Sequence, residues 1–175
     1  MPNANTFNII PIRKFIQTYN FIGAESIDPF ANKCRIAKIT NDLDPEMGTT
    51  YCMDALDFIT QLKDNSVDLV LFDPPYTQRQ VSEHYKRLGK TVTMETTQST
   101  FWSNLKNEIS KKVKTGGVVL CFGYNSGGIG SSRGFKLNEI LLVAHGGNHN
   151  DTICTAESKV ENLFSKLEAH ETHQV

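Results

Sequence analysis

Short apolar runs alternate with amphipathic segments along most of this chain. The clearest run spans Val67 to Phe72, where branched and aromatic side chains predominate, and two consecutive prolines follow it. Such a run is typical of a buried strand, and a proline cannot donate to the hydrogen-bond ladder of a sheet. Gly117 to Phe122 has the same apolar character. We therefore expect two central strands, at 67–72 and 117–122.

Amphipathic segments predict the helices. Segment 53–59 is predicted to start a helix, with Asp54 as a plausible N-cap and with Leu56, Ile59 and Leu62 along one face. A longer helix is predicted over 98–114, because its apolar residues recur at helical spacing and lysines gather in its last turn. The glycine pair at 116–117 would then end this helix.

The remaining apolar segments predict the outer parts of a sheet. Segment 25–30 is interpreted as the end of a strand and 36–43 as a second strand, whereas 7–19 fits either a short strand or a helix that enters the domain. Segments 138–144 and 151–158 flank a glycine-containing loop, as in an antiparallel hairpin. Strands that alternate with helices indicate a parallel sheet covered by helices. The predicted fold class is α/β, with a mostly parallel sheet and a terminal antiparallel hairpin.

Composition narrows the class of protein. With 175 residues, of which 39% are hydrophobic and 21% charged, the chain is long enough for one domain with a sizeable core. No apolar stretch approaches the ~20 residues of a membrane span, and residues 1–6 lack the order of a signal peptide. We therefore expect a cytoplasmic protein. The net charge of −1 requires any contact with nucleic acid to rest on a local basic patch.

The four cysteines do not form a metal-binding pattern. None of them has C-x-x-C spacing, and each lies in or beside an apolar segment. Free core thiols in a reducing compartment are the expected result, and no metal site is predicted. The four residues are Cys34, Cys52, Cys121 and Cys154.

A short motif directly follows the strand at 67–72. Its residues are Asp73, Pro74, Pro75 and Tyr76. In an open α/β sheet, ligands bind beyond the carboxyl ends of the strands, where these side chains would project. Taken alone, the motif could also be a proline-rich turn with a capping aspartate.

Asp-Pro-Pro-Tyr after an apolar strand resembles the catalytic motif of the S-adenosylmethionine-dependent amino-methyltransferases, above all those that methylate N6 of adenine in DNA. The resemblance covers about residues 20–158. It implies a Rossmann-like methyltransferase fold, S-adenosylmethionine as cofactor and DNA as partner. Small bacterial and phage enzymes of the orphan type are the most similar kind.

The chemistry of that reaction suits the motif. An exocyclic amine is a poor nucleophile because its lone pair is delocalised into the base. The Asp73 carboxylate and the Pro74 carbonyl could each accept one N–H of the amine, which favours a lone pair aimed at the methyl donor. Tyr76 would stack on the base once it is turned out of the helix, a contact worth roughly 1–3 kcal/mol.

The same resemblance places a cofactor-binding segment near residue 30. It is similar to the family's Asp-Pro-Phe-Ala motif, whose acid and aromatic residue lie near the methionine moiety. The four matching residues are Asp28, Pro29, Phe30 and Ala31. The family usually continues Gly-Ser-Gly, whereas this chain has Asn-Lys-Cys at 32–34. Because asparagine adopts the left-handed conformation at moderate cost, Asn32 is expected to replace the glycine in part. An Asp-Pro turn at a strand end is the alternative interpretation.

Two more acids extend the expected cofactor site. Asp42 fits the position where an acid accepts hydrogen bonds from ribose hydroxyls, and Asp44 competes for that role. Asp44 could instead cap the turn that Pro45 begins. Asp54 and Ala55 occupy the position where the family holds the adenine amine of the cofactor, although a helix N-cap explains Asp54 equally well.

Substrate contacts are expected after the catalytic motif. Segment 77–98 is locally basic, and Arg79, Lys86 and Arg87 could hold phosphates beside the flipped base, together with Tyr76. Ordinary solvated charges on an exposed helix are an equally good interpretation.

The domain organisation is predicted to be simple. Residues 1–175 form one catalytic domain, and apolar residues at helical spacing after residue 158 suggest a terminal helix that docks on the core or on a second subunit. We expect no separate target-recognition domain. The protein would then read little DNA sequence, form a homodimer, or obtain specificity from a partner.

Two rival functions remain open at this point. Related motifs also serve enzymes that methylate N6 of adenine or N2 of guanine in structured RNA. The absence of the usual glycines after Phe30 favours a second rival, a non-catalytic binding subunit of a methyltransferase complex.

Overall fold

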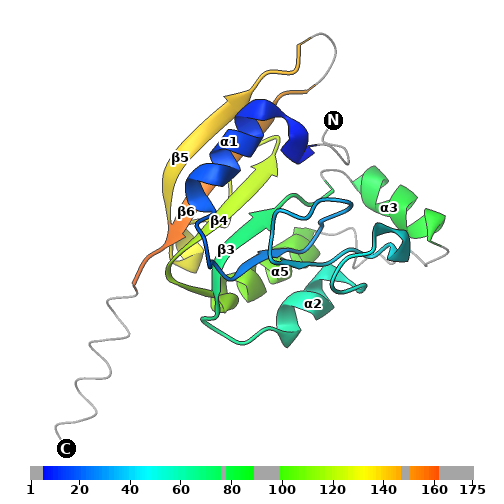
Figure 1. The fold of residues 1–175 in the computed structure, drawn as a ribbon, viewed down its shortest axis with the longest axis horizontal. Helices are drawn as coiled ribbons and strands as arrows, with labels where there is room; N and C mark the ends of the chain where they lie inside the picture. The colour runs from blue at the N-terminus through cyan, green and yellow to red at the C-terminus, as the bar shows by residue number, and fades with distance from the viewer. Residues whose placement is uncertain (1–5, 76–77, 89–98, 147–149, 162–175) are drawn as a thin grey trace, which may run out of the picture.

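Strands from both halves of the chain form a single mixed sheet (Figure 1). The computed structural model describes residues 6–75, 78–88, 99–146 and 150–161. Within them, the strand order is β2-β1-β3-β4-β6-β5. The strands are β1 (Ser26–Asp28), β2 (Ile39–Thr40), β3 (Val67–Phe72), β4 (Val113–Gly123), β5 (Phe135–Val143) and β6 (Thr152–Lys159). The first four are parallel, and β6 runs antiparallel to β4 and to β5. The predicted α/β fold with a terminal hairpin is confirmed.

Helices cover both faces of the sheet, as Figure 1 shows. The helices are α1 (Ile10–Tyr19), α2 (Ala55–Gln61), α3 (Gln78–Arg87) and α5 (Ser99–Lys112), with 3₁₀ turns η1 (Thr6–Asn8), η2 (Pro45–Met47) and η3 (Ser131–Arg133). Helix α1 packs on one face with Leu69 and Leu71 of β3. Helices α2 and α5 pack on the other face with Val70 and Phe72. Alternate residues of β3 thus enter separate cores, which explains why the whole run is apolar.

The boundary between α5 and β4 differs from the prediction. Val113 continues the apolar spacing of the helix, but it pairs with Val67 and begins β4. The next pair joins Leu69 to Val118, so residues 114–117 form an irregularity in the ladder. Gly116 has φ 82° there, a backbone conformation that glycine adopts readily. The expected helix stop at 116–117 is therefore wrong, because the helix already ends at Lys112 and strand pairing begins at Val113.

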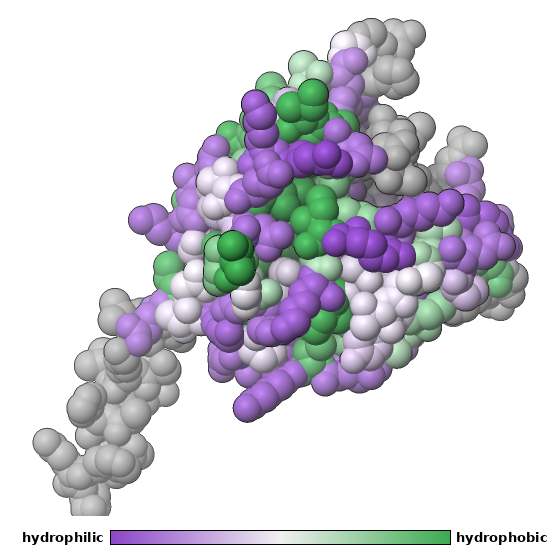
Figure 2. Space-filling model, viewed as in Figure 1, coloured by the Kyte–Doolittle hydropathy of each residue, from purple (hydrophilic) through white to green (hydrophobic). Residues whose placement is uncertain are grey.

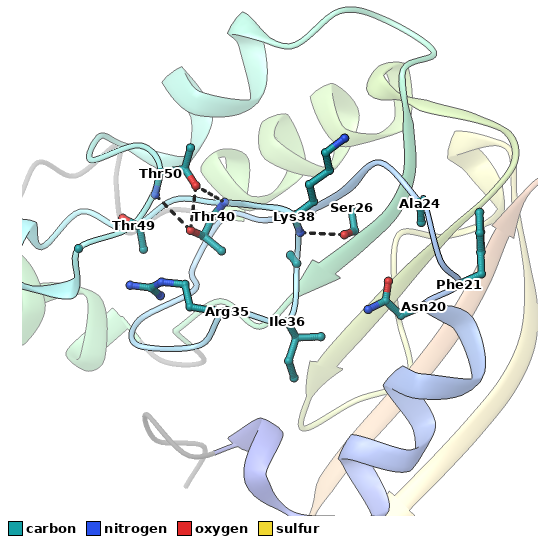
Figure 3. Close-up of a pocket in the computed structure, with 13 residues that line it drawn as sticks. Asn20, Phe21, Ala24, Ser26, Arg35, Ile36, Lys38, Thr40, Thr49 and Thr50 are labelled. Atoms are coloured by element: carbon teal, nitrogen blue, oxygen red, sulfur yellow. Dashed lines mark hydrogen bonds between the residues drawn. The ribbon is translucent and has the colours of Figure 1, made fainter.

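The connection between β1 and β2 carries no helix. Parallel strands usually need a crossover of a dozen or more residues, but β1 ends at Asp28 and β2 begins at Ile39. A hollow of about 680 Å³ lies beside this short connection (Figure 3). Its lining residues include Ser26 and Lys38, and the backbone N–H of Lys38 donates to Oγ of Ser26 at 2.9 Å. The hollow lies toward the amino ends of β1 and β2, away from the carboxyl ends where ligands of such sheets bind.

Apolar side chains on the surface are distributed over several elements. In the view of Figure 2, green patches alternate with purple ones. The large exposed apolar residues of the described chain are Ile10, Phe21, Ile22, Tyr51, Leu137, Ile140, Leu142 and Val160. In the same part of the chain, none of the helices combines the length and apolar character that crossing a bilayer requires.

The cysteines are all free, but they do not all lie in the core. Cys154 is buried, Cys34 and Cys121 are intermediate, and Cys52 is exposed. The prediction of a core position is therefore wrong for Cys52, which lies just before the N-cap of α2 rather than inside an element.

Candidate active site

Three predicted acids come together where the parallel strands end. Asp28 is the last residue of β1, Asp73 follows β3, and Asp42 lies two residues after β2. The negative charges of Asp73 and Asp42 both raise the pKa of the Asp28 carboxyl, which places the three groups within electrostatic range of one another. This is the edge at which ligands bind in open α/β sheets.

Asp28 is fully buried, and only one of its two carboxyl oxygens has a hydrogen-bond partner among the described residues. Its Oδ1 accepts a hydrogen bond from the backbone N–H of Phe30 at 3.0 Å, whereas Oδ2 has no partner among the described residues. Burial is the main cause that raises the pKa of this carboxyl well above its usual range; the Phe30 N–H acts in the opposite direction. A buried carboxylate oxygen without a partner is costly, so the site favours a ligand that brings a proton donor or a positive charge.

The loop after β1 is held by Asp42. The backbone N–H of Asn32 donates to Oδ2 of Asp42, and that of Asp44 donates to Oδ1, both at 2.9 Å. Asn32 has φ 49°, so the expected left-handed conformation is confirmed. Asp42 thereby joins the segment at 28–32 to the end of the second strand.

Asp44 caps the turn at Pro45, as one of the two interpretations predicted. Its Oδ1 accepts from the backbone N–H of Glu46 at 2.9 Å. Its Oδ2 accepts from Nη2 of Arg87 on α3 at 2.8 Å. The Asp44 side chain is only 4% exposed, so this ion pair is buried at its acidic end.

Asp54 is the N-cap of α2, also as predicted. Its Oδ1 accepts from the backbone N–H of Leu56 at 2.9 Å. Its Oδ2 accepts from the hydroxyl of Tyr85 on α3 at 2.7 Å. The neighbouring Ala55 is buried at the start of the helix. Helix α3 therefore contacts both Asp44 and Asp54, which lie on the same connection, between β2 and β3.

Aromatic side chains form the apolar side of the site. The ring of Phe30 lies 5.9 Å from that of Phe72 and 6.2 Å from that of Trp102, measured between ring centroids. Trp102 comes from α5, and sequence reasoning assigned no role to it or to Tyr85. No local signal marks either residue, because each reaches the site only through contacts between elements distant in sequence.

The remaining predicted residues are placed in part. Pro29 and Ala31 lie with Asp28 in the loop after β1, and Asp73, Pro74 and Pro75 are partly buried directly after β3. Tyr76 lies outside the described residues. Arg79 lies on α3, but its side chain is outside the described part, and Lys86 is exposed on the same helix. The role of these residues in binding substrate stays a prediction.

The described residues contain no group of three or more His, Cys, Asp or Glu side chains arranged to hold a metal ion. The polar part of the site in this portion of the chain thus consists of carboxylates that accept from backbone N–H groups and from α3.

Comparisons in sequence give no assignment. No protein-family profile matches the chain, and no curated protein matches it either.

Comparisons of structure find similar folds among methyltransferases. The chain aligns with the N-methyltransferase NodS from Bradyrhizobium japonicum WM9 with TM-score 0.56 and 12% identity, over 90% of this chain and 98% of that one. It aligns with a 1,6-didemethyltoxoflavin-N1-methyltransferase from Burkholderia thailandensis, whose crystal structure holds S-adenosylhomocysteine, with TM-score 0.53 and 8% identity over 92% of each chain.

A third similar structure is TrmN from Thermus thermophilus. The TM-score is 0.55 and the identity 13%, over 85% of this chain and 48% of that one. The chain therefore spans about half the length of TrmN. Likeness at such low identity is evidence for the fold, and the fold of this chain is the Rossmann-like fold found in these methyltransferases.

Proposed function

We propose that this protein is an S-adenosylmethionine-dependent methyltransferase that acts on the exocyclic N6 amine of adenine in DNA. The observation that carries the proposal is the position of the Asp-Pro-Pro segment. It begins at the carboxyl end of β3, and the charge of Asp73 acts on the buried carboxyl of Asp28 at the end of the adjacent strand β1. A candidate catalytic acid and a candidate cofactor-binding acid thus share one edge of the sheet.

The residues at this edge fit the proposed cofactor. The free Oδ2 of Asp28 can accept from an ammonium group, and the nearby charge of Asp42 favours a ligand with positive charge. Phe30 and Ala31 offer apolar contacts, while Pro29 and Asn32 shape the loop; Asp42 and Asp54, with Ala55, would serve the ribose and the adenine. S-adenosylmethionine supplies a methyl group on a positively charged sulfur. The similar fold of a methyltransferase that binds S-adenosylhomocysteine supports the same cofactor here.

The roles at the target amine follow from the acceptors that the motif provides. The Asp73 carboxylate and the Pro74 carbonyl each accept one N–H of the amine and orient its lone pair. Proline fixes φ near −65°, so this carbonyl is held in one direction at little entropic cost. Pro75 ends the strand, and Tyr76 stacks on the base. Such preorganised acceptors act without reorganisation during the reaction.

The choice of adenine in DNA rests on the sequence motif rather than on the fold. Arg79, Lys86 and Arg87 would assist through the phosphates, and a homodimer or a partner protein would supply specificity beyond one compact domain. RNA as the substrate is the closest rival, since the acceptors described above would serve an amine in either polymer.

The test is nucleoside mass spectrometry. Unmethylated DNA and RNA are incubated separately with the purified chain and S-adenosylmethionine. We expect N6-methyladenine in DNA, reduced about 100-fold or more in Asp73→Ala and in the isosteric Asp73→Asn. Cofactor affinity should be retained in both variants, because the carboxylate of Asp73 acts on the amine.

Other outcomes would replace the proposal. Methylation confined to RNA would assign the RNA base amino-methyltransferase function. Micromolar binding of S-adenosylmethionine without methylation of either polymer would favour a role beside a catalytic partner.

A further inference from the structure

Helix α3 bridges two acids of the candidate cofactor site. The Tyr85 hydroxyl donates to Oδ2 of Asp54 at 2.7 Å, and Nη2 of Arg87 donates to Oδ2 of Asp44 at 2.8 Å. Both acceptors lie on the connection between β2 and β3, and each also accepts from the backbone N–H two residues further on. The end of α3 is thus attached at two points to the connection that carries the proposed adenosine-binding acids.

Each contact has a partner that is at least half-buried. The side chain of Asp44 is 4% exposed, so without Arg87 a buried carboxylate would lose the positive charge that pairs with it. Tyr85 is half-buried, and its burial is the main cause that raises the pKa of its phenol, with the charge of Asp54 acting in the same direction. The phenol therefore remains a hydrogen-bond donor at neutral pH.

The hydrogen bonds of Tyr85 and Arg87 concern the cofactor site as well as the stability of α3, because their acceptors are Asp54 and Asp44. Asp54 is the residue proposed to hold the adenine amine, and its Oδ2 is occupied by the Tyr85 hydroxyl in this structure. Asp44 caps the turn that follows the proposed ribose-binding Asp42. A helix attached at these two points contacts the acid proposed to hold the adenine amine and the turn beside the proposed ribose-binding acid.

We propose that Tyr85 and Arg87 are positioning residues that hold α3 over the adenosine side of the cofactor site, and thereby set the rates at which the cofactor enters and leaves. This inference rests on the proposed function. Release of the two contacts moves α3 away. A carboxylate oxygen can accept more than one hydrogen bond, so Asp54 can hold the adenine amine while Tyr85 still donates to it.

The test is stopped-flow binding of S-adenosylmethionine to the full chain without DNA. Trp102 is the only tryptophan of the sequence and contacts Phe30, so its fluorescence reports on the site. In Tyr85→Phe and in Arg87→Gln we expect the association and the dissociation rate constants each to rise about tenfold, because each change removes one hydrogen bond with a charged partner.

The control lies on the same helix. Ser82→Ala, one turn before Tyr85, removes a hydroxyl that makes neither of these contacts and should leave both rate constants unchanged. Tyr85→Phe keeps the packed ring, and thermal unfolding of each variant checks the fold.

The association and dissociation rate constants together distinguish a helix that covers the cofactor site from residues that merely stabilise the bound cofactor. If only the dissociation rate constant rises in Tyr85→Phe and Arg87→Gln, the residues stabilise the bound cofactor without covering its site, and the inference is overturned. Unchanged rate constants in both variants would overturn it as well, while the proposed function would stand. Failure of the unmodified chain to bind S-adenosylmethionine would overturn the proposed function and this inference together.

Discussion

The backbone at Asn32 is left-handed, with φ 49°, in a loop that Asp42 holds by a hydrogen bond to the same residue. A residue other than glycine, asparagine or aspartate adopts this left-handed conformation at a cost of roughly 1–2 kcal/mol. We therefore expect Asn32→Ala to lower the free energy of unfolding by about 1 kcal/mol, and Asn32→Gly to change it by less than about 0.5 kcal/mol. Urea denaturation measures both. Equal losses in the two variants would mean that the side chain, and not the backbone conformation, matters here.

Burial of Asp28 makes the stability depend on pH. The folded protein holds the proton of this carboxyl more tightly than the unfolded chain, whose pKa is close to the ordinary value of 3.8. The contribution of Asp28 is then fully present below pH ~4 and is lost as pH rises through the raised pKa, by up to about 1.4 kcal/mol per pH unit. The difference in unfolding free energy between the unmodified chain and Asp28→Asn should therefore decrease above pH ~4. A constant difference across this range would show that Asp28 ionises normally in the folded state.

Among the elements, the connection from β4 to β5 is held by a carboxylate from β6. Glu157 is buried and accepts from the backbone N–H groups of Ile129 and Gly130. Gly128 has φ 44°, and a Cβ there would overlap the Glu157 carboxylate. Gly128→Ala should therefore lower the unfolding free energy by about 3 kcal/mol, the sum of left-handed strain and overpacking. Gly134, with φ 80° and open space around it, is the matched control.

The control isolates the overlap from the backbone strain. Gly134→Ala meets only the cost of a left-handed alanine, about 1 kcal/mol. Thermal or urea denaturation of the two variants gives the comparison. Similar losses at both positions would show that the Glu157 carboxylate moves aside freely.

Local patterns were sufficient for elements whose boundaries are set by nearby residues. The Asp54 cap fixes the start of α2, and the proline pair after Phe72 fixes the end of β3. Local patterns failed where a residue distant in the sequence sets the boundary of an element. Val113 leaves the helical pattern because it pairs with Val67, and nothing near it in the sequence indicates that partner. The short link between β1 and β2 likewise lacks the helix that alternation alone suggests.

At the scale of the whole molecule, the candidate site depends on contacts across the chain. The sequence placed the acids at strand ends correctly, because a strand end is a local feature. Tyr85 and Asp54 lie 31 residues apart, and their hydrogen bond follows from how α3 lies against the start of α2. Trp102 reaches Phe30 in the same way, from another helix. Such partners are set by the packing of elements rather than by spacing within one of them.

Because the net charge of the chain is −1, the proposed binding of DNA must rest on a local group of basic residues. Lys86 is exposed on α3 near the carboxyl edge of the sheet, whereas Lys14 is exposed on α1, which covers one of the sheet faces. Lys86→Gln and Lys14→Gln change the net charge equally, so the long-range field of the molecule changes by a similar amount in both. If Lys86 contacts a phosphate, its loss should reduce the slope of log K against log salt concentration by about 0.9, and Lys14→Gln should leave the slope unchanged. Fluorescence anisotropy of a labelled duplex at several salt concentrations measures the slopes. Equal slopes in the two variants would show that Lys86 does not contact a phosphate. Other residues would then provide the affinity for DNA.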